Sequence, residues 1–399
     1  MLKNVTQLYH IAQKPERRIV GLMSGTSLDG LDVALCRISG EGRSTQVTLE
    51  AFETHPYPDA LKESIRNVFA REQIAFQELT LLHATIADTH AALVLDSLQK
   101  WAVAPGEVDL IASHGQTVFH APRVLHGRSD APNATLQIGD GDHIARRTGI
   151  ITVSDFRQKH VAAGGEGAPL ALYGDYLLFS QESIHRILLN IGGIANFTLL
   201  PAAGSTARVI ATDTGPGNTL TDAFARELFE VPYDQNGRLA TAGVPDQALL
   251  DALWEDPFFH APYPHTTGPE LFNAAWVRRA MERLPKGSPA VNPYNLMATL
   301  TAFTAETIAT AVEQVAPGLH GEVWVSGGGA NNPVIMNHLK EKMPRWTVGP
   351  LDDLGIPGDA KEAILFALLA NECVAGTTGY DALRHYAPDV TMGKISFPD

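Results

Sequence analysis

Cysteine is almost absent from this sequence, which carries only Cys36 and Cys373 among its 399 residues. Two cysteines cannot build the disulfide framework of a small secreted domain. Both lie in apolar stretches, where a thiol is more often buried than reactive. No apolar run approaches the roughly 18 residues of a membrane-spanning helix, and residues 1–17 lack the apolar core of a signal peptide. We therefore expect a cytoplasmic protein with no membrane partner.

Basic residues are also in the minority, since 30 Lys and Arg face 44 Asp and Glu, for a net charge of −14. No basic stripe is visible, which argues against nucleic acid as the main partner. The acidic excess serves solubility. A chain of this length, with 45% hydrophobic residues, can form two domains with sizeable cores.

Two common phosphate-binding signatures are missing, the G-x-x-x-x-G-K-[ST] loop and the dinucleotide fingerprint. Instead, the apolar runs 18–23 and 31–36 enclose a small, hydroxyl-rich turn, a pattern that predicts strand, tight hairpin and strand. Glycines let the backbone approach a ligand, and successive N–H groups in such a turn can hold phosphate oxygens. The alternative is an ordinary glycine hairpin whose aspartates only accept turn hydrogen bonds. The candidate nucleotide-binding residues are Gly25, Thr26, Ser27, Asp29, Gly30 and Asp32, and Asp29 is also the candidate magnesium ligand.

Two later segments have similar features. Residues 187–198 predict a second strand, turn and strand, and residues 322–326 predict a strand that opens into three glycines before a helical segment. Glycines at such a junction let a base or ribose lie against the backbone beside a helix N-terminus. Three such loops in this order resemble the actin, sugar-kinase and Hsp70 superfamily. The further candidate nucleotide-binding residues are Gly192, Gly193, Gly215, Gly327, Gly328, Gly329 and Asn331.

Asp213 is the candidate catalytic residue. We expect a short strand over residues 209–211, with Asp213 at its end before a Gly-Pro-Gly turn and a helix from Asn218. A carboxylate held by a rigid turn can be aimed at a substrate as a general base. The alternative is that Asp213 only caps the turn and the helix that follows it.

Taken together, these motifs resemble the 1,6-anhydro-N-acetylmuramic acid kinases, the sugar kinases of peptidoglycan recycling and amino-sugar catabolism. The resemblance extends from residue 21 to about residue 370, nearly the whole chain. The segments that carry it are 21–35, 113–122, 136–140, 155–157, 162–170, 190–193, 213–218, 267–273 and 326–330.

The resemblance implies a fold as well as an activity. It implies an α/β protein with the two-lobed actin-like ATPase fold, built from internally duplicated ribonuclease H-like sheets, with ATP and sugar in the interdomain cleft. Domain I would comprise residues 1–148 and about 371–399, with the first phosphate loop. Domain II would comprise residues 149–370, with the second phosphate loop and the adenosine loop. A homodimer is also implied by the resemblance.

In this family an ATP- and Mg²⁺-dependent kinase opens the 1,6-anhydro bridge hydrolytically. The resemblance places the family's catalytic aspartate at Asp213, which would activate a water for attack on C1 of the sugar. The freed O6 would then take the phosphoryl group, giving N-acetylmuramic acid 6-phosphate and ADP.

Several polar residues in these motifs are candidates for sugar binding. His114 and His120 flank Gln116, but two histidines six residues apart with no third ligand are poor evidence for a metal. A sugar or lactyl-carboxylate contact fits better, and Arg157 could meet the same carboxylate as a fork. The substrate-binding candidates are His114, Gln116, Arg157, Glu166, Glu270 and Glu362. Glu270 could instead be an acid in the first turn of a helix from Leu271, and Glu362 could lie on a solvated helix face.

Three positions depart from the family pattern, which leads us to expect Asp at 160, Gln at 166 and His near 175. This chain has His160, Glu166 and Asp175, which puts the identity of the sugar in question more than phosphoryl transfer. One alternative is a kinase for another anhydrosugar, of the levoglucosan type, or for a plain aminosugar. A non-catalytic nucleotide clamp of the actin or Hsp70 kind is disfavoured, because Asp213 and the phosphate loops are present.

Overall fold

The computed structural model describes residues 3–25, 28, 30–168, 170–268, 270–285, 287, 291–376, 383 and 388–399. The chain forms two compact units, Met1–Leu178 with Asp359–Asp399 and Phe179–Gly358. The units therefore divide near residues 178 and 358 rather than near the expected 148 and 370. The reason is that strand β6 (Thr152–Ser154) pairs with the first sheet and helix α14 (Lys361–Ala375) packs on it.

The first unit contains a mixed sheet in the order β12-β6-β4-β1-β2-β3, with β5 paired to β4. Strand β1 is antiparallel to β2, as the apolar runs predict, and parallel to β4. The strands are β1 (Glu16–Ser24), β2 (Gly30–Ser39), β3 (Gln46–Pro56), β4 (Leu110–Ala121), β5 (Ala134–Ile138), β6 and β12 (Lys394–Ser396).

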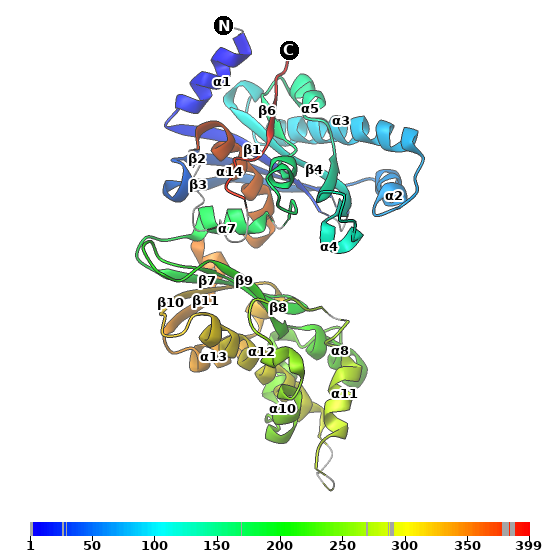
Figure 1. Ribbon diagram of the computed structural model, residues 1–399, viewed down its shortest axis with the longest axis vertical. Helices are drawn as coiled ribbons and strands as arrows, with labels where there is room; N and C mark the ends of the chain where they lie inside the picture. The colour runs from blue at the N-terminus through cyan, green and yellow to red at the C-terminus, as the bar shows by residue number, and fades with distance from the viewer. Residues whose placement is uncertain are drawn as a thin grey trace. The chain divides into compact units, whose positions relative to one another are not determined.

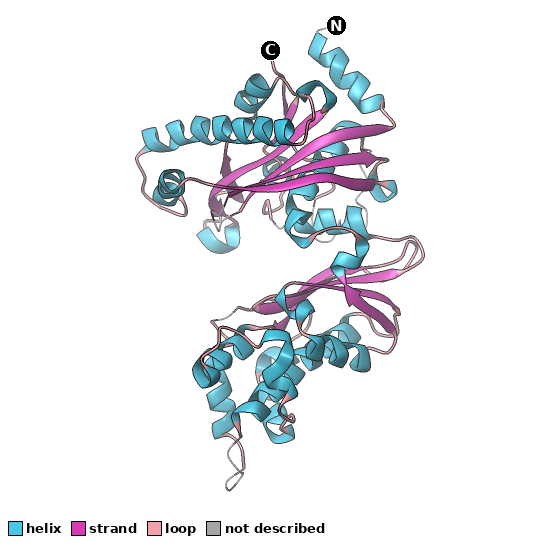
Figure 2. Ribbon diagram, turned by 180° about the vertical axis from the view of Figure 1, so that it is seen from behind, coloured by secondary structure: helices cyan, strands magenta, loops and turns pink. Residues whose placement is uncertain are grey.

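Long helices cover both faces of this sheet (Figures 1 and 2). Val20 and Leu22 of β1 belong to a core that includes residues of α3. Gly21, between them, faces α14, where a Cβ would lie 2.0 Å from the carbonyl oxygen of Ala363. The close approach of α14 therefore requires glycine here. The helices are α1 (Lys3–Gln13), α2 (Asp59–Val68), α3 (Phe76–Lys100), α4 (Arg123–His126), α5 (Gly141–Thr148), α6 (Arg157–Ala162), α7 (Ala171–Phe179) and α14.

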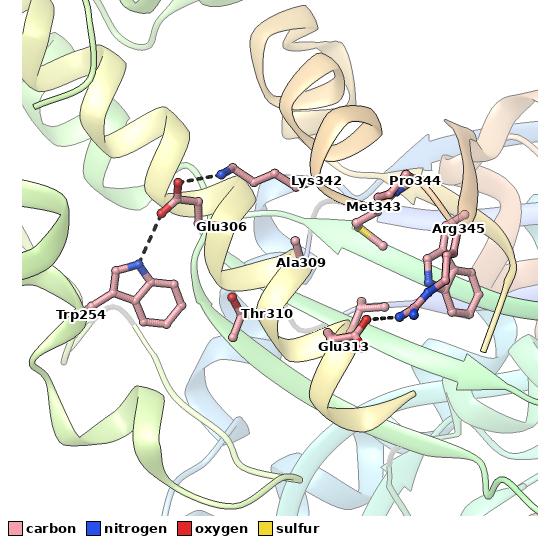
Figure 3. A pocket seen from close by; sticks show the side chains of 11 residues that line it. Trp254, Glu306, Ala309, Thr310, Glu313, Lys342, Met343, Pro344 and Arg345 are labelled. Atoms are coloured by element: carbon pink, nitrogen blue, oxygen red, sulfur yellow. Dashed lines mark hydrogen bonds and ion pairs between the residues drawn. The ribbon is translucent and has the colours of Figure 1, made fainter. Parts of the chain in front are cut away.

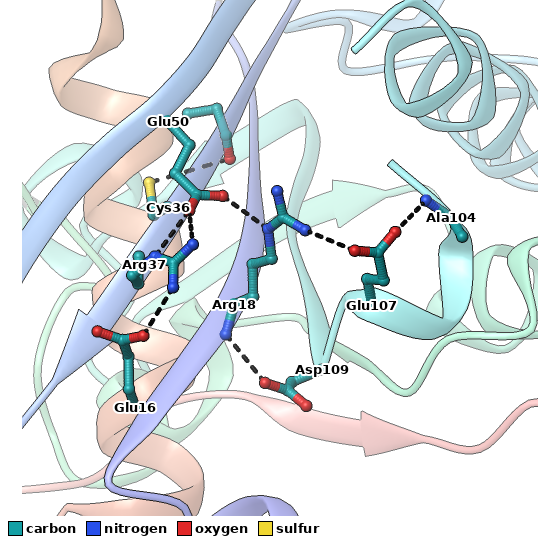
Figure 4. A network of polar contacts seen from close by, with 9 residues as sticks. Glu16, Arg18, Cys36, Arg37, Glu50, Ala104, Glu107 and Asp109 are labelled. Carbon is teal, nitrogen blue, oxygen red and sulfur yellow. Dashed lines mark hydrogen bonds and ion pairs between the residues drawn. The ribbon is translucent and has the colours of Figure 1, made fainter. Parts of the chain in front are cut away.

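A network of charges ties β1, β2 and β3 together (Figure 4). The Glu50 carboxylate accepts hydrogen bonds from Arg18 Nε at 2.6 Å and from Arg37 Nε at 2.7 Å, and Arg37 also pairs with Glu16 at 3.0 Å. Although partial burial alone would raise the pKa of Glu50, the two guanidinium groups hold it below its ordinary value. Since Glu16 begins β1 and Ser24 ends it, the network fixes the end of the β1–β2 pair opposite to the turn.

The second unit repeats the strand arrangement of the first. Its sheet has the order β11-β10-β7-β8-β9, with β7, β8 and β9 antiparallel in succession and β7 parallel to β10. The first unit has the same relations among β1, β2, β3 and β4, which confirms the predicted duplication and the two-lobed α/β fold. The strands are β7 (His185–Ile191), β8 (Ile194–Leu200), β9 (Ile210–Pro216), β10 (Gly321–Ser326) and β11 (Trp346–Pro350).

Helix α12 joins two apolar clusters in this unit. Ala305, Ile308 and Val312 pack on the sheet, whereas Leu296, Leu300 and Phe303 pack among the other helices.

In the described ranges, no helix combines the length and the apolar character needed to cross a membrane. The helices are α8 (Thr219–Phe229), α9 (Arg238–Thr241), α10 (Gln247–Trp254), α11 (Ala274–Glu282), α12 (Pro293–Val315) and α13 (Pro333–Lys342).

Candidate functional site

The predicted first phosphate loop joins β1 to β2, but Thr26, Ser27 and Asp29 lie outside the described residues. Gly25 begins the turn, and its carbonyl oxygen accepts hydrogen bonds from Leu28 N at 3.4 Å and Gln116 Nε2 at 3.3 Å. Gly30 has a packing reason to be glycine, because a Cβ there would lie 2.1 Å from the carbonyl oxygen of His55. Phosphate binding by this loop remains a prediction.

Asp32 and Glu362 place two carboxyl groups in the first unit. Asp32, on β2, accepts a hydrogen bond from the Thr54 hydroxyl at 2.6 Å. Glu362 lies in the first turn of α14 and is accessible to solvent. Loss of hydration by the surrounding protein raises the pKa of Glu362, and the negative charge of Asp32 raises it further. The positive charges of Arg157 and Lys361 oppose this shift. The structure therefore brings two other predicted site residues, Asp32 and Arg157, within electrostatic reach of Glu362.

Arg157 is held by two groups of the same unit. Its Nε donates to His114 Nε2 at 3.0 Å, and its Nη1 donates to the carbonyl oxygen of Gly167 at 2.6 Å. The His114 ring lies against Phe366, with ring centroids 4.7 Å apart. Burial, reinforced by the charge of Arg157, lowers the pKa of His114 to about 3. A neutral His114 can therefore accept from Arg157 and fix the direction of its guanidinium.

Gln116 is fully buried, and its amide bonds to the chain itself. The Oε1 atom accepts from the Ser24 hydroxyl at 2.5 Å, and Nε2 donates to the carbonyl oxygens of Gly25 and Thr117. Gln116 thus binds Ser24 and Gly25, the two residues at which β1 leads into the first phosphate loop. Its predicted contact with the sugar remains a prediction.

Two of the three departures from the expected pattern, His160 and Asp175, have partners inside the first unit. His160 is buried and accepts a hydrogen bond from Gly167 N at 2.9 Å. Asp175, also buried, forms an ion pair of 2.6 Å with Lys361. The third departure, Glu166, lies near His120. Burial and the charge of Arg157 lower the pKa of His120, and the charge of Glu166 opposes this shift.

Asp213 lies inside strand β9, opposite Asn196 of β8. The expectation that it ends a strand at residue 211 is wrong, because β9 continues its pairing through Pro216. The Oδ2 atom accepts from Thr267 N at 2.7 Å, and the Asp213 N–H donates to the carbonyl oxygen of His265 at 3.1 Å. Burial raises the pKa of Asp213, while the Thr267 N–H and His265 oppose that shift. The result is a partly buried carboxyl group with one oxygen fixed.

The second predicted phosphate loop, at Gly192 and Gly193, is tied to the start of α8. The Gly192 carbonyl oxygen accepts from Asn218 N at 2.8 Å, and that of Gly193 accepts from Gly217 N at 2.9 Å and Thr219 N at 3.1 Å. One of these donors, Thr219 N, is the first N–H group of α8, which a helix start otherwise leaves open. A Cβ at Gly217 would lie 2.3 Å from Gly192 O, so the contact depends on glycine.

Gly215 and Gly329 are packed rather than open. Gly215 has φ 132°, and a Cβ there would lie 2.9 Å from Phe259 Cε1. A Cβ on Gly329 would lie 2.3 Å from Ile191 Cγ2. Gly327 and Gly328 are exposed, but a Cβ on Gly327 would lie 2.7 Å from the carbonyl oxygen of Ile191. Of these four glycines, therefore, Gly328 alone is exposed and has no backbone atom packed against its Cβ position.

A pocket of about 490 Å³ lies beside Gly328. It includes the predicted residues Gly328 and Asn331, and its volume falls in the range of small-molecule sites. Its one aromatic side chain, Tyr233, is 53% exposed. Burial raises the pKa of the lining Asp222. The lining residues are Asn218, Thr221, Asp222, Tyr233, Asp234, Gln235, Asn236, Gly328, Asn331 and Asn332.

Sequence reasoning missed most of this lining and also Thr267 as the partner of Asp213. The four-residue spacing of Asn218 and Asp222 at a helix start could have shown that both lie on one face. Tyr233 lies in the loop after α8, and Asn236 lies in a single 3-10 turn (Gln235–Gly237) before α9. Neither segment is long enough for a periodic pattern to mark a residue as part of a site.

Glu270 lies in a turn and is exposed. The expected helix from Leu271 is wrong, because Asn273 caps α11 by accepting from Trp276 N at 3.1 Å and the helix begins at Ala274. Glu270 is therefore not a first-turn acid of that helix. Its carboxylate lies over Gly268, where a Cβ would come within 2.2 Å of Oε2, next to the residue that binds Asp213. Sugar binding by Glu270 remains a prediction.

A larger hollow of about 680 Å³ lies between α12 and the segment that joins α13 to β11 (Figure 3). Its charged groups pair with each other: Lys342 with Glu306 at 2.8 Å, and Arg345 with Glu313. Trp254 Nε1 also donates to Glu306, at 3.4 Å. None of the predicted site residues that the structure describes lines this hollow, and we assign it no ligand.

Comparison with known proteins identifies one family across the chain. Residues 17–385 match the family described as anhydro-N-acetylmuramic acid kinase. A protein of that name from Pseudoalteromonas atlantica is 49% identical over 403 residues, covering all of both chains. Another from Caldanaerobacter subterraneus is 37% identical and covers 98% of this chain and 99% of its own. A solved ROK family glucokinase from Streptomyces griseus, in complex with glucose and AMPPNP, aligns with 88% of this chain and 98% of its own, at 12% identity and a TM-score of 0.32.

Proposed function

Because the chain belongs to the anhydro-N-acetylmuramic acid kinase family, we propose that it converts 1,6-anhydro-N-acetylmuramic acid and ATP into N-acetylmuramic acid 6-phosphate and ADP. This reaction belongs to peptidoglycan recycling. The observation that carries the proposal is the 49% identity to a relative of this name over the full length of both chains. Asp213 and the glycines that shape the second loop are all present in this chain.

Asp213 is the proposed general base. Thr267 N–H occupies Oδ2, which leaves Oδ1 to accept a proton from water. The water oxygen bonds to C1 of the sugar, and the C1–O6 bond breaks with its electron pair on O6. O6 then attacks the γ-phosphorus, and ADP leaves. A raised pKa suits this role, because proton transfer is most effective when the pKa of the base lies nearer to the working pH.

The second unit is proposed to hold the nucleoside part of ATP. The pocket beside Gly328 and Asn331 has room for a nucleoside. The carbonyls of Gly192 and Gly193 already accept from the N–H groups of Gly217, Asn218 and Thr219, so we assign phosphate contacts at this loop to its own N–H groups.

The first unit is proposed to recognise the lactyl carboxylate of the sugar through Arg157. A guanidinium can bind a carboxylate with two parallel hydrogen bonds, and His114 and Gly167 already fix its direction. Levoglucosan has no such carboxylate. His160 and Asp175 bond to Gly167 and Lys361 within the unit, so these departures from the family pattern do not call for a different sugar.

Magnesium, a homodimer and a cytoplasmic location remain proposals. Mg²⁺ binds through one or two carboxylates together with substrate phosphates and water, and Asp32 and Glu362 offer oxygen donors of this kind. Among the described residues no group of three or more His, Cys, Asp or Glu forms a metal cage, and Asp29, the predicted ligand, is not among those residues. The metal would neutralise phosphate charge. Sedimentation would test the dimer, which rests on the family resemblance alone.

The product distinguishes this function from simple phosphorylation. Hydrolysis with phosphoryl transfer adds the elements of one water and one phosphoryl group to the sugar, whereas phosphorylation of an intact anhydrosugar adds the phosphoryl group only. Mass spectrometry of the product separates the two. A phosphorylated product that keeps the anhydro bridge would refute the role given to Asp213 and its water.

A further inference from the structure

A chain of buried hydrogen bonds leads from helix α3 to the first phosphate loop. His90 Nε2 lies 2.6 Å from the Tyr57 hydroxyl, which lies 3.0 Å from Ser24 Oγ. Ser24 Oγ in turn lies 2.5 Å from Gln116 Oε1. The four side chains come from α3, the residue after β3, the end of β1, and β4. None is more than 3% exposed, so no solvent competes for these bonds.

Only one placement of protons satisfies all three contacts. Gln116 Oε1 is an acceptor, so the Ser24 hydroxyl must donate to it. The Ser24 oxygen then accepts from Tyr57, which uses the single proton of that hydroxyl. His90 must therefore donate to Tyr57 from Nε2. Burial lowers the pKa of His90 to about 4 and raises that of Tyr57, so this arrangement does not change around neutral pH.

Gln116, at the end of this series of hydrogen bonds, holds Ser24 and Gly25, where β1 leads into the loop. Gln116 Oε1 binds the Ser24 side chain, and Nε2 donates to the Gly25 carbonyl oxygen at 3.3 Å. The orientation of this one amide therefore sets both residues. We propose that His90 and Tyr57 are positioning residues, which fix Ser24 and Gly25 at the start of the predicted first phosphate loop without touching the nucleotide. The proposal rests on the proposed function only for the ligand assigned to that loop.

A second hydrogen bond, which joins β3 itself to α3, supplies a matched control. His55 Nε2, on β3, lies 2.6 Å from the hydroxyl of Ser97, on α3. Ser97 is buried like His90. This bond links β3 to α3 at the same length as the Tyr57–His90 bond. It makes no contact with Ser24 or Gln116 among the hydrogen bonds of the described residues.

Replacing Tyr57 with Phe removes the hydroxyl and leaves the ring. Loss of one buried hydrogen bond that leaves a partner unsatisfied changes an equilibrium constant by roughly 5- to 150-fold. We expect KM for ATP to rise at least about fivefold, with KM for the sugar within about twofold. Tyr57→Phe and Ser97→Ala should lower Tm to a similar degree, because each removes one buried hydrogen bond. Ser97→Ala should leave both KM values at the wild-type level.

The His90 variants provide a second measurement. His90→Gln keeps a donor at the Nε2 position, whereas His90→Leu has none. We expect KM for ATP in His90→Gln to lie near the wild-type value and that in His90→Leu to match Tyr57→Phe. Calorimetry of AMPPNP binding without sugar compares the nucleotide affinities of the same variants independently of turnover. It therefore still tests the role of the hydrogen-bond chain if the proposed sugar is wrong.

A purely structural role would give a different result. If Tyr57→Phe, His90→Leu and Ser97→Ala all lowered Tm alike and all bound AMPPNP as the wild type does, the proposed positioning role would be overturned. If nucleotide binding weakened only in Tyr57→Phe and His90→Leu, the positioning role would be supported.

Discussion

Replacement of Asp213 with asparagine separates the catalytic role of this side chain from its structural one. Asparagine has the same shape and can still accept the Thr267 N–H bond, which is 2.7 Å long in the present structure. It cannot take a proton from water. A general base contributes about 10²–10⁴-fold to a rate, which is about 2.7–5.4 kcal/mol of activation free energy at 1.36 kcal/mol per tenfold. We expect kcat to fall by this factor.

The same substitution should not destabilise the protein at neutral pH. Burial raises the pKa of Asp213 in the folded state. A carboxyl group with a raised folded pKa contributes stability below its unfolded pKa and loses that contribution as the pH rises through the folded value. At pH 7 the ionised group therefore lowers the free energy of unfolding, and asparagine removes this effect. We expect Tm of Asp213→Asn to equal or exceed that of the wild type at pH 7, and this advantage to vanish in acid.

Asp222→Asn is the matched control, because it makes the same chemical change at another carboxyl group whose pKa burial raises. Asp222 lines the pocket proposed for the nucleoside, so its loss should change KM for ATP while kcat stays within about threefold, the scale of one net hydrogen bond. A coupled assay for ADP and a thermal melt measure both variants. A kcat of Asp213→Asn within tenfold of the wild type would refute the assignment of the base.

The remaining predictions concern packing, the sugar and pH. Gly21→Ala should lower the free energy of unfolding by about 1–3 kcal/mol or more, because its Cβ would lie 2.0 Å from Ala363 O; an unchanged urea midpoint would contradict this. Arg157→Lys keeps the charge but loses the fork, so KM for the anhydrosugar should rise about tenfold or more with KM for ATP unchanged, and equal rises in both would count against a carboxylate contact. The acidic limb of the kcat/KM profile, which reports the free enzyme, should lie above pH 3.8, the ordinary pKa of Asp, because that of Asp213 is raised; a limb at or below this pH would contradict the shift.

The features that local sequence determines were predictable. The apolar runs around residues 25–30 gave two paired strands, and the three glycines at 327–329 follow a strand and precede helix α13. These patterns depend on neighbouring residues only, and the order of the loops then indicated the superfamily. The duplicated sheets followed from that order, because each hairpin begins an equivalent set of strands.

Features that depend on distant contacts were not predictable. Gly30 and Gly329 were assigned to the ligand, yet each also touches a residue that is remote in sequence, His55 and Ile191 respectively. The role of a glycine in packing depends on what faces it, which a single sequence does not reveal. The start of α11 was misplaced because Asn273, rather than an earlier residue, supplies the cap.

The hydrogen-bond chain behind the first loop shows the same limit. His90 and Ser24 are 66 residues apart in sequence, and His90 lies in a helix whose pattern marks it only as part of an inward face. Its role arises from the fold, which brings α3 and β3 to the end of β1.

The most direct test of the central claim is ADP release by the wild-type protein with ATP and Mg²⁺ in the presence of three sugars in parallel. These are 1,6-anhydro-N-acetylmuramic acid, levoglucosan and N-acetylmuramic acid. The proposed function predicts turnover on the first sugar alone, with a 6-phosphosugar as product. Turnover only on levoglucosan or N-acetylmuramic acid, or on none of the three, would contradict it.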